Sequence, residues 1–120
     1  MRIYLAGGMR GIPDFNFPAF HAAAARLRAE GHVVFNPAEK DLETFGDKAS
    51  SPTGNEKTFA RKVGMTPMEL RRAVFFVDVE WICRNADAIY LLPGWQASKG
   101  ATAERALGIA LGLEIVELAA

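Results

Sequence analysis

The chain has 120 residues, half of them hydrophobic, so it can bury one continuous core without disulfides or a metal. Its 14 basic and 14 acidic residues give no net charge, which argues against a nucleic-acid polymer as partner and favours a small ligand. One cysteine and two histidines supply neither a disulfide nor a zinc site, and no apolar stretch reaches the length of a signal-peptide core or a membrane span, so a cytoplasmic protein is expected.

The first third of the chain predicts a right-handed βαβ unit. A short apolar strand ends at two glycines, a helix with apolar residues at helical spacing follows, and a second apolar strand ends at Asn36-Pro37. Two strands that one helix joins in this way are parallel neighbours. The strands are predicted at residues 3–6 and 32–35, and the helix from residue 17 or 18 to residue 30.

Residues 38–66 interrupt this alternation. Glycines, serines and prolines are mixed with charged residues, and little apolar periodicity remains, so a long loop is predicted. Because the segment starts where a strand of the predicted sheet ends, it is either a mobile lid over a ligand or a solvated surface excursion. Five cations could reach a phosphate from it: Lys40, Lys48, Lys57, Arg61 and Lys62.

The remainder of the chain returns to alternating elements. A helix at 67–84, a strand at 88–92, a helix at 101–111 and a last strand at 114–118 are predicted. This order is typical of a single α/β domain with a doubly wound parallel sheet, flavodoxin-like or Rossmann-like. Such sheets bind ligands at the carboxyl ends of their strands.

Two glycine-containing segments at strand ends offer groups that bind anions. Gly7, Gly8 and Arg10 supply backbone N–H groups and a guanidinium, and Ser98 and Gly100 precede a helix. The plain alternative is an ordinary glycine turn with a solvated arginine, and a serine that only caps the helix. The glycine spacing is not GxGxxG and the second strand does not end in an acid, so NAD bound in the Rossmann manner is not expected.

Two carboxyl groups are predicted to face the same cleft. Asp78 lies at the margin of the inward stripe of its helix, where desolvation favours the protonated form, unless it is a surface aspartate. Glu104 is expected in the first turn of its helix, facing the sheet, where the helix dipole favours the ionised form. Alternatively, the Glu104 carboxylate only stabilises the helix through its interaction with the dipole. Two carboxyl groups in different protonation states are the equipment for cleaving a glycosidic bond.

Four short motifs stand out at these positions: Tyr4-Leu5-Ala6-Gly7, Asp78-Val79-Glu80-Trp81, Ala86-Asp87-Ala88 and Ser98-Lys99-Gly100-Ala101-Thr102-Ala103-Glu104. Together they resemble the nucleoside 2-deoxyribosyltransferase-like superfamily. The resemblance covers most of the chain except residues 38–66. It is greatest to small phage-type members, which share the Phe-Asn-Pro and Leu-Pro-Gly-Trp runs.

The resemblance implies roles for individual residues. Glu104 matches the glutamate that attacks the anomeric carbon of deoxyribose, Asp78 the aspartate that assists at the sugar and leaving base, and Tyr4 the tyrosine that orients the nucleophile. Arg10 and Ser98 match phosphate-binding residues of the deoxynucleoside 5′-monophosphate N-glycosidases. Other features depart from the relatives, which carry a serine at the position of Gly8 and further ligand-binding residues beyond the position of Ala120.

The sequence thus predicts an N-glycosidase acting on a nucleoside 5′-monophosphate through a glycosyl-glutamate intermediate, without cofactor or metal. Arg10, Ser98 and the backbone of Gly7, Gly8 and Gly100 are expected to hold the phosphate, and Trp95 either stacks on the base or belongs to the core. The alternatives are base exchange by a nucleoside 2-deoxyribosyltransferase, NAD glycohydrolysis, and nucleotide binding without catalysis. A homodimer or higher homo-oligomer is expected, because a neighbouring subunit completes the site in the relatives.

Overall fold

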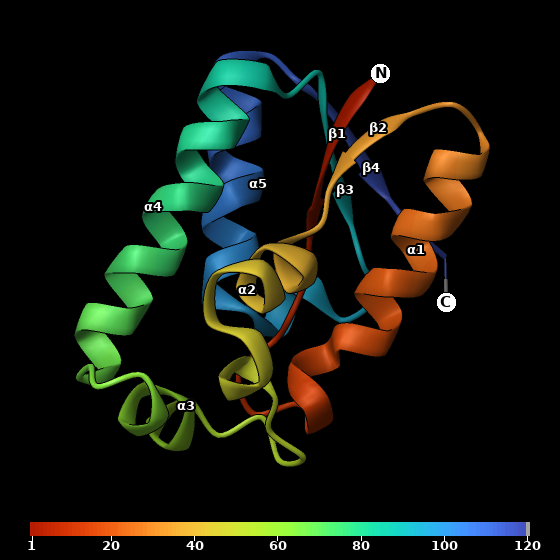
Figure 1. The fold of residues 1–120 in the computed structure, drawn as a ribbon. Helices are drawn as coiled ribbons and strands as arrows, with labels where there is room; N and C mark the ends of the chain where they lie inside the picture. The colour runs from red at the N-terminus through yellow and green to blue at the C-terminus, as the bar shows by residue number, and fades with distance from the viewer. Residues whose placement is uncertain (120) are drawn as a thin grey trace.

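A four-stranded, all-parallel sheet in the order β2-β1-β3-β4 forms the centre of the computed structural model, which describes residues 1–119 (Figure 1). Helix α1 (Phe17–Ala29) covers one face of the sheet, and α4 (Pro67–Asn85) and α5 (Lys99–Leu111) cover the other. The predicted doubly wound α/β fold is confirmed, with a flavodoxin-like strand order. The strands are β1 (Arg2–Ala6), β2 (Val33–Phe35), β3 (Ala88–Leu91) and β4 (Glu114–Glu117).

Strand β1 contributes to the packing on both faces. Ile3 and Leu5 belong to the apolar cluster that contains the α1 residues, whereas Tyr4 and Ala6 belong to the cluster formed with α4 and α5. This alternation follows from the two-residue period of a strand. It places Tyr4 beneath the two helices that carry the predicted acids. Gly108 lets α5 approach the sheet closely, because a Cβ atom there would lie 2.6 Å from Ile89 Cγ1.

The start of α5 differs from the prediction by two residues. The helix begins at Lys99, and the Ser98 hydroxyl caps it by accepting a hydrogen bond of 3.1 Å from the Ala101 N–H. Glu104 therefore lies in the second turn of the helix rather than the first. The other predicted helix and strand boundaries agree with the structure to within one residue.

The segment 38–66 contains helices where the sequence predicts a long loop. Asn36 caps α2 by accepting a hydrogen bond of 2.9 Å from the Ala38 N–H, and Asn55 caps α3 through a bond of 3.1 Å from the Thr58 N–H. The loop prediction is wrong because such short helices depend on caps and tertiary packing rather than on a long apolar period. The elements of this segment are α2 (Pro37–Phe45), a 3₁₀ helix (Gly46–Ala49) and α3 (Glu56–Lys62).

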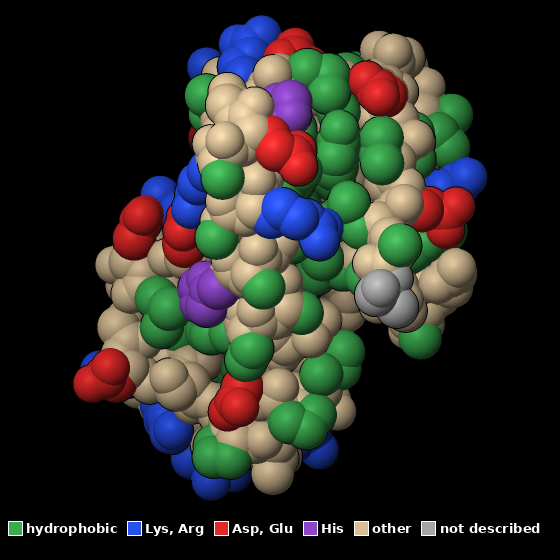
Figure 2. All heavy atoms as spheres, turned by 90° about the vertical axis from the view of Figure 1, so that its right-hand side faces the viewer, with side chains coloured by type: hydrophobic (Ala, Val, Ile, Leu, Met, Phe, Trp, Pro, Cys, Tyr) green, Lys and Arg blue, Asp and Glu red, His purple; other side chains and the backbone are tan. Residues whose placement is uncertain are grey.

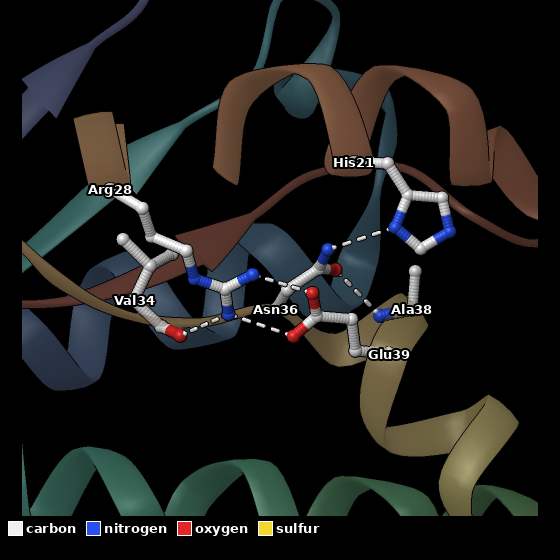
Figure 3. Close-up of polar contacts among 6 residues, drawn as sticks. All are labelled: His21, Arg28, Val34, Asn36, Ala38 and Glu39. Carbon is white, nitrogen blue, oxygen red and sulfur yellow. Dashed lines mark hydrogen bonds and ion pairs between the residues drawn. The ribbon is translucent and has the colours of Figure 1, made fainter. Parts of the chain in front are cut away.

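Polar contacts fix α2 to the end of β2 and to α1 (Figure 3). The Arg28 guanidinium donates to both carboxylate oxygens of Glu39, at 2.5 and 2.7 Å, and to the Val34 carbonyl oxygen at 2.8 Å. The Asn36 amide lies 3.2 Å from His21 Nδ1. These contacts set the direction in which α2 leaves the sheet.

Aromatic packing and one backbone contact hold α3 against the first loop. The Phe59 ring lies 5.6 Å from Phe15 and 5.2 Å from Phe45, centroid to centroid. The Gly11 N–H donates to the Gly54 carbonyl oxygen at 2.9 Å. Gly54 has φ of +69°, and a Cβ atom there would lie 2.0 Å from a backbone oxygen, so only glycine is compatible with this contact.

The face covered by α1 carries interspersed acidic and basic side chains, with hydrophobic side chains between them (Figure 2). No large patch of a single charge is visible on this face, in agreement with the zero net charge of the chain. Among the described residues, none of the helices combines the length and apolar character needed to cross a membrane.

Candidate active site

A cavity of about 450 Å³ lies at the carboxyl ends of β1 and β3. The chain leaves β1 toward β2 on one side and β3 toward β4 on the other, so the cavity occupies the point where the strand order reverses. Its volume suits a small ligand. The polar and charged side chains that line it are Tyr4, Arg10, Asp41, Glu56, Arg71, Asp78, Ser98, Lys99 and Glu104.

Tyr4 and Glu104 form a buried pair in the cavity. The tyrosine hydroxyl donates a hydrogen bond of 2.6 Å to Glu104 Oε2, and Glu104 is 6 % exposed. Burial raises the pKa of Glu104 to about 8, and the hydrogen bond from Tyr4 opposes this shift. Burial thus opposes the ionised form that the helix dipole favours, and Glu104 lies beyond the first turn, where the dipole is strongest.

Asp78 faces the same cavity from α4 and is 7 % exposed. It lies between the buried residues Leu70 and Ile82 on one helix face, which is further inward than the margin position that the sequence indicates. Burial, and then the charges of Glu104 and Asp41, raise the pKa of Asp78 to about 9. Burial, and then the charges of Glu104 and Asp78, raise the pKa of the Tyr4 hydroxyl, so the three groups lie near one another.

The residues predicted to bind phosphate line one end of the cavity. Gly7 and Gly8 come from the loop after β1, and Ser98 and Gly100 come from the start of α5. A Cβ atom on Gly8 would lie 3.9 Å from Ser98 Cβ, so the two segments are in close proximity. They lie at the N-terminal end of α5, where an anion is favoured.

Arg10 lies at the cavity mouth and is engaged in a charged cluster. Its Nε is 3.6 Å from Glu56 Oε2, and the Arg71 guanidinium contacts both oxygens of Glu56, at 2.6 and 3.1 Å. Glu56 comes from α3 and Arg71 from α4, so the cluster joins three segments. One anion between two cations leaves a positive charge at this edge of the cavity.

Trp95 is not among the residues that line the cavity. Gly94, with φ of +85°, turns the chain into a short 3₁₀ helix, and the indole Nε1 donates to Glu117 at 2.8 Å. The Arg105 guanidinium lies over the indole, 5.2 Å from the ring centroid. The structure thus does not place Trp95 where it could stack on a base in the cavity. Apolar side chains of Phe15 and Phe59 line the cavity instead.

Sequence reasoning missed four charged residues of the cavity: Asp41, Glu56, Arg71 and Lys99. Asp41 is 8 % exposed, and burial raises its pKa to about 7. Two possible helix caps in the sequence, Asn36 and Asn55, could have indicated the helices that carry Asp41 and Glu56. Within residues 1–119, no cluster of three or more His, Cys, Asp or Glu side chains could hold a metal ion.

Residues 1–117 match the model of a family described as Domain of unknown function (DUF4406). The chain belongs to this family. The DUF4406 domain spans β1 to β4 and includes every residue that lines the cavity. No curated protein and no solved structure shows a significant match to the chain.

Proposed function

We propose that this DUF4406 protein is an N-glycosidase that cleaves the bond between base and sugar in a nucleoside 5′-monophosphate, with the deoxyribonucleotides as first candidates. The observation that carries the proposal is the buried Tyr4–Glu104 hydrogen bond in a cavity that also holds Asp78. An oriented carboxylate and a second, neutral carboxyl group are what a retaining glycosidase requires. The sequence resemblance to the nucleoside 2-deoxyribosyltransferase-like superfamily supports the same assignment.

The reaction begins with ionised Glu104. Burial raises the pKa of both Glu104 and Asp78, and the charge of an ionised Glu104 raises that of Asp78 further, so ionisation of Glu104 favours the neutral form of Asp78. A Glu104 oxygen attacks the anomeric carbon and the base departs, while the Tyr4 hydroxyl holds the carboxylate in position. Water then cleaves the glycosyl ester and regenerates the carboxylate.

The 5′-phosphate binds at the start of α5 in this proposal. Glu104 lies six positions after Ser98, or about 9 Å along the helix axis, which leaves room for a sugar between phosphate and nucleophile. The N–H groups of Gly8 and Gly100 and the Ser98 hydroxyl bind the phosphate oxygens, and Arg10 exchanges part of its contact with Glu56 for the phosphate.

The activity is tested by incubating the protein with canonical and modified nucleoside 5′-monophosphates and detecting free base by chromatography. Formation of a new nucleoside after addition of a second base would identify base exchange instead. Release of nicotinamide from NAD would identify a glycohydrolase of that cofactor. Tight nucleotide binding without any product would indicate a non-catalytic binding protein and contradict the proposal.

Arg10→Ala is expected to raise KM for a monophosphate far more than KM for the matching nucleoside. A charge-assisted phosphate contact contributes about 1.5–3 kcal/mol, which corresponds to at least about tenfold in KM. Arg72→Ala is the matched control, because Arg72 is an exposed residue of α4 that does not line the cavity. An equal effect of Arg10→Ala on both substrate forms would mean that Arg10 does not bind the phosphate.

The proposed enzyme is expected to be a homodimer or a higher homo-oligomer. Large apolar side chains are exposed on the two helices that cover one face of the sheet, among them Met68 and Phe76 on α4 and Ile109 on α5, and Phe76 is 66 % exposed. Burial of such side chains favours association. Light scattering checks this expectation, and a monomeric mass in a fully active sample would contradict it.

The part of segment 38–66 that follows α2 is expected to act as a lid. It lies at the cavity through Glu56 and Phe59, so opening requires that the Glu56 ion pairs and the packing of Phe59 are lost. Hydrogen exchange in this segment should slow when a nucleotide binds to the inactive Glu104→Gln protein. Unchanged exchange there, with protection limited to the residues around Gly8 and Ser98, would contradict the lid.

A further inference from the structure

Asp41 is a buried carboxyl group to which the reaction described so far gives no role. It lies on α2, lines the cavity and is 8 % exposed. Within residues 1–119, no hydrogen bond or ion pair to its carboxyl group is found, and no fully buried side-chain oxygen lacks a partner, so the Asp41 oxygens are accessible from the cavity. The contacts of Figure 3 hold α2 firmly on β2 and α1, so the position of Asp41 is set by the fold rather than by a partner side chain.

The order of the strands places Asp41 at the opposite end of the cavity from the phosphate groups. Ser98 follows β3, Tyr4 lies on β1, and Asp41 follows β2, while the sheet order is β2-β1-β3. The electrostatic effects agree with this sequence of positions. Besides burial, the charges of Glu104 and Asp78 raise the pKa of the Tyr4 hydroxyl. The charge of Asp41 raises the pKa of Asp78, after burial and the charge of Glu104.

The cavity therefore has three parts that correspond to the parts of a nucleotide. The anion-binding groups lie at the β3 end, the Tyr4–Glu104 pair lies over β1, and Asp41 lies at the β2 end. Apolar side chains of the same cavity include Phe15, Phe59 and Leu70. A wall of aromatic and aliphatic side chains suits the flat faces of a base, and a single polar group among them suits its edge.

We propose that Asp41 is the acid that protonates the departing base, which leaves Asp78 to hold the sugar. The inference rests on the proposed function. In a retaining reaction the nucleophile and the leaving group lie on opposite faces of the anomeric carbon, so the acid must lie across the substrate from Glu104. Asp41 meets this condition better than Asp78, which lies beside Tyr4 and the nucleophile.

The proton and electron balance of the step is complete with Asp41 alone. The Glu104 oxygen forms a bond to the anomeric carbon, the carbon–nitrogen bond breaks with its electron pair on the base, and the Asp41 proton passes to the base. Water then attacks the same carbon from the face that the base has left and gives its proton to the Asp41 carboxylate. The ester bond breaks with its electron pair on Glu104, which restores both groups.

Burial raises the pKa of Asp41 to about 7 and that of Glu104 to about 8, so the reactive form, in which Asp41 is protonated and Glu104 is ionised, has its largest share between these two values. The titratable and charged groups that line the same cavity are Tyr4 from β1, Arg10 from the first loop, Glu56 from α3, Arg71 and Asp78 from α4, and Lys99 and Glu104 from α5.

The test compares two leaving groups in the Asp41→Asn variant, which preserves the shape of the side chain but cannot release a proton. One substrate is the best natural monophosphate found in the chromatographic panel, and the other is 4-nitrophenyl 2-deoxyribofuranoside 5-phosphate, whose phenolate leaves without a proton. The variant is expected to lose at least about 100-fold in kcat on the natural substrate and less than about threefold on the nitrophenyl substrate. Asp47→Asn, at an exposed position outside the cavity, is the matched control and should change neither rate.

A loss of equal size on both substrates, or no loss on the natural one, would overturn the role of Asp41. The pH profile gives a second, independent measurement. On the natural substrate, kcat of the unmodified protein should fall as pH rises above about 8, and this alkaline limb should be lost or shifted in Asp41→Asn. An identical alkaline limb in both proteins would also overturn the role. Base release from no nucleotide by the unmodified protein would instead remove the proposed function, and this inference with it.

Discussion

Glu104→Gln is expected to lower turnover by at least about 1000-fold while the protein remains folded. Glutamine has nearly the same volume as glutamate and can still accept the hydrogen bond of 2.6 Å that the Tyr4 hydroxyl donates. It cannot form the glycosyl ester, so the two-step reaction has no first step. The measurement is release of free base from a monophosphate, together with circular dichroism and thermal unfolding of the same sample.

The matched control is Glu80→Gln on α4, which is exposed and does not line the cavity. It makes the same chemical change on the surface and should leave turnover within about twofold, as expected of a substitution away from the site. Near-normal base release by a folded Glu104→Gln protein would show that Glu104 is not the nucleophile. A large loss in both variants would point to a shared effect on assembly instead of chemistry.

The convergence of Asp78 and Glu104 on one cavity could be predicted from the sequence patterns, whereas Tyr4 was indicated only by the resemblance. A strand that stops at Gly7-Gly8 and helices with clear apolar stripes define a parallel sheet, and the carboxyl ends of parallel strands meet at one edge. The anion-binding loop and the start of α5 follow from the same topology. Local patterns sufficed here because each element is long or is ended by an unambiguous signal.

The contribution of residues 38–66 could not be predicted in the same way. Helices α2 and α3 have nine and seven residues, which is too short for apolar periodicity to stand out from the surrounding polar residues. Their position depends on contacts distant in the sequence, such as Phe59 with Phe15. Because Asp41 and Glu56 lie on these helices, two acids of the cavity went unrecognised with them.

Side-chain direction and protonation also depended on the folded structure. The indole of Trp95 turns toward Glu117, which lies on β4, and nothing in the local sequence indicates that partner. For Glu104, a dipole argument from the sequence favours an ionised group, but burial among α4, α5 and β1 raises its pKa instead. Burial is a tertiary property, so it could oppose an expectation drawn from one helix alone.

The stability of the protein should fall as pH rises from about 5 to about 9, because three carboxyl groups are buried in the cavity. Burial raises the pKa of Asp41 to about 7, of Glu104 to about 8 and of Asp78 to about 9. In the unfolded chain these groups titrate near pH 4. Between the two ranges the unfolded state releases protons that the folded state keeps, so each rise in pH favours unfolding.

The carboxyl groups with a lowered pKa change the free energy of unfolding with pH in the opposite direction. Glu39, bonded to Arg28, and Asp87, bonded to Arg2, stabilise the folded state above about pH 4 and lose this contribution only at lower pH. The free energy of unfolding should therefore be greatest near pH 4 to 5. Above that, each buried acid lowers it by up to about 1.4 kcal/mol per pH unit until its own folded pKa is passed.

Glu104→Gln and Asp78→Asn provide the test, because each removes one buried acid without leaving a cavity. At about pH 9 both variants should unfold at a higher temperature than the unmodified protein, and at about pH 5 the difference should be small. Thermal or urea unfolding across this range measures the effect, with exposed Glu80→Gln as the control that should follow the unmodified protein at every pH. A melting temperature of the unmodified protein that stays constant or rises between about pH 5 and 9 would contradict the protonated, desolvated cavity. A gain in stability that accompanies the loss of base release would show that the acids are retained for chemistry at a cost to the fold.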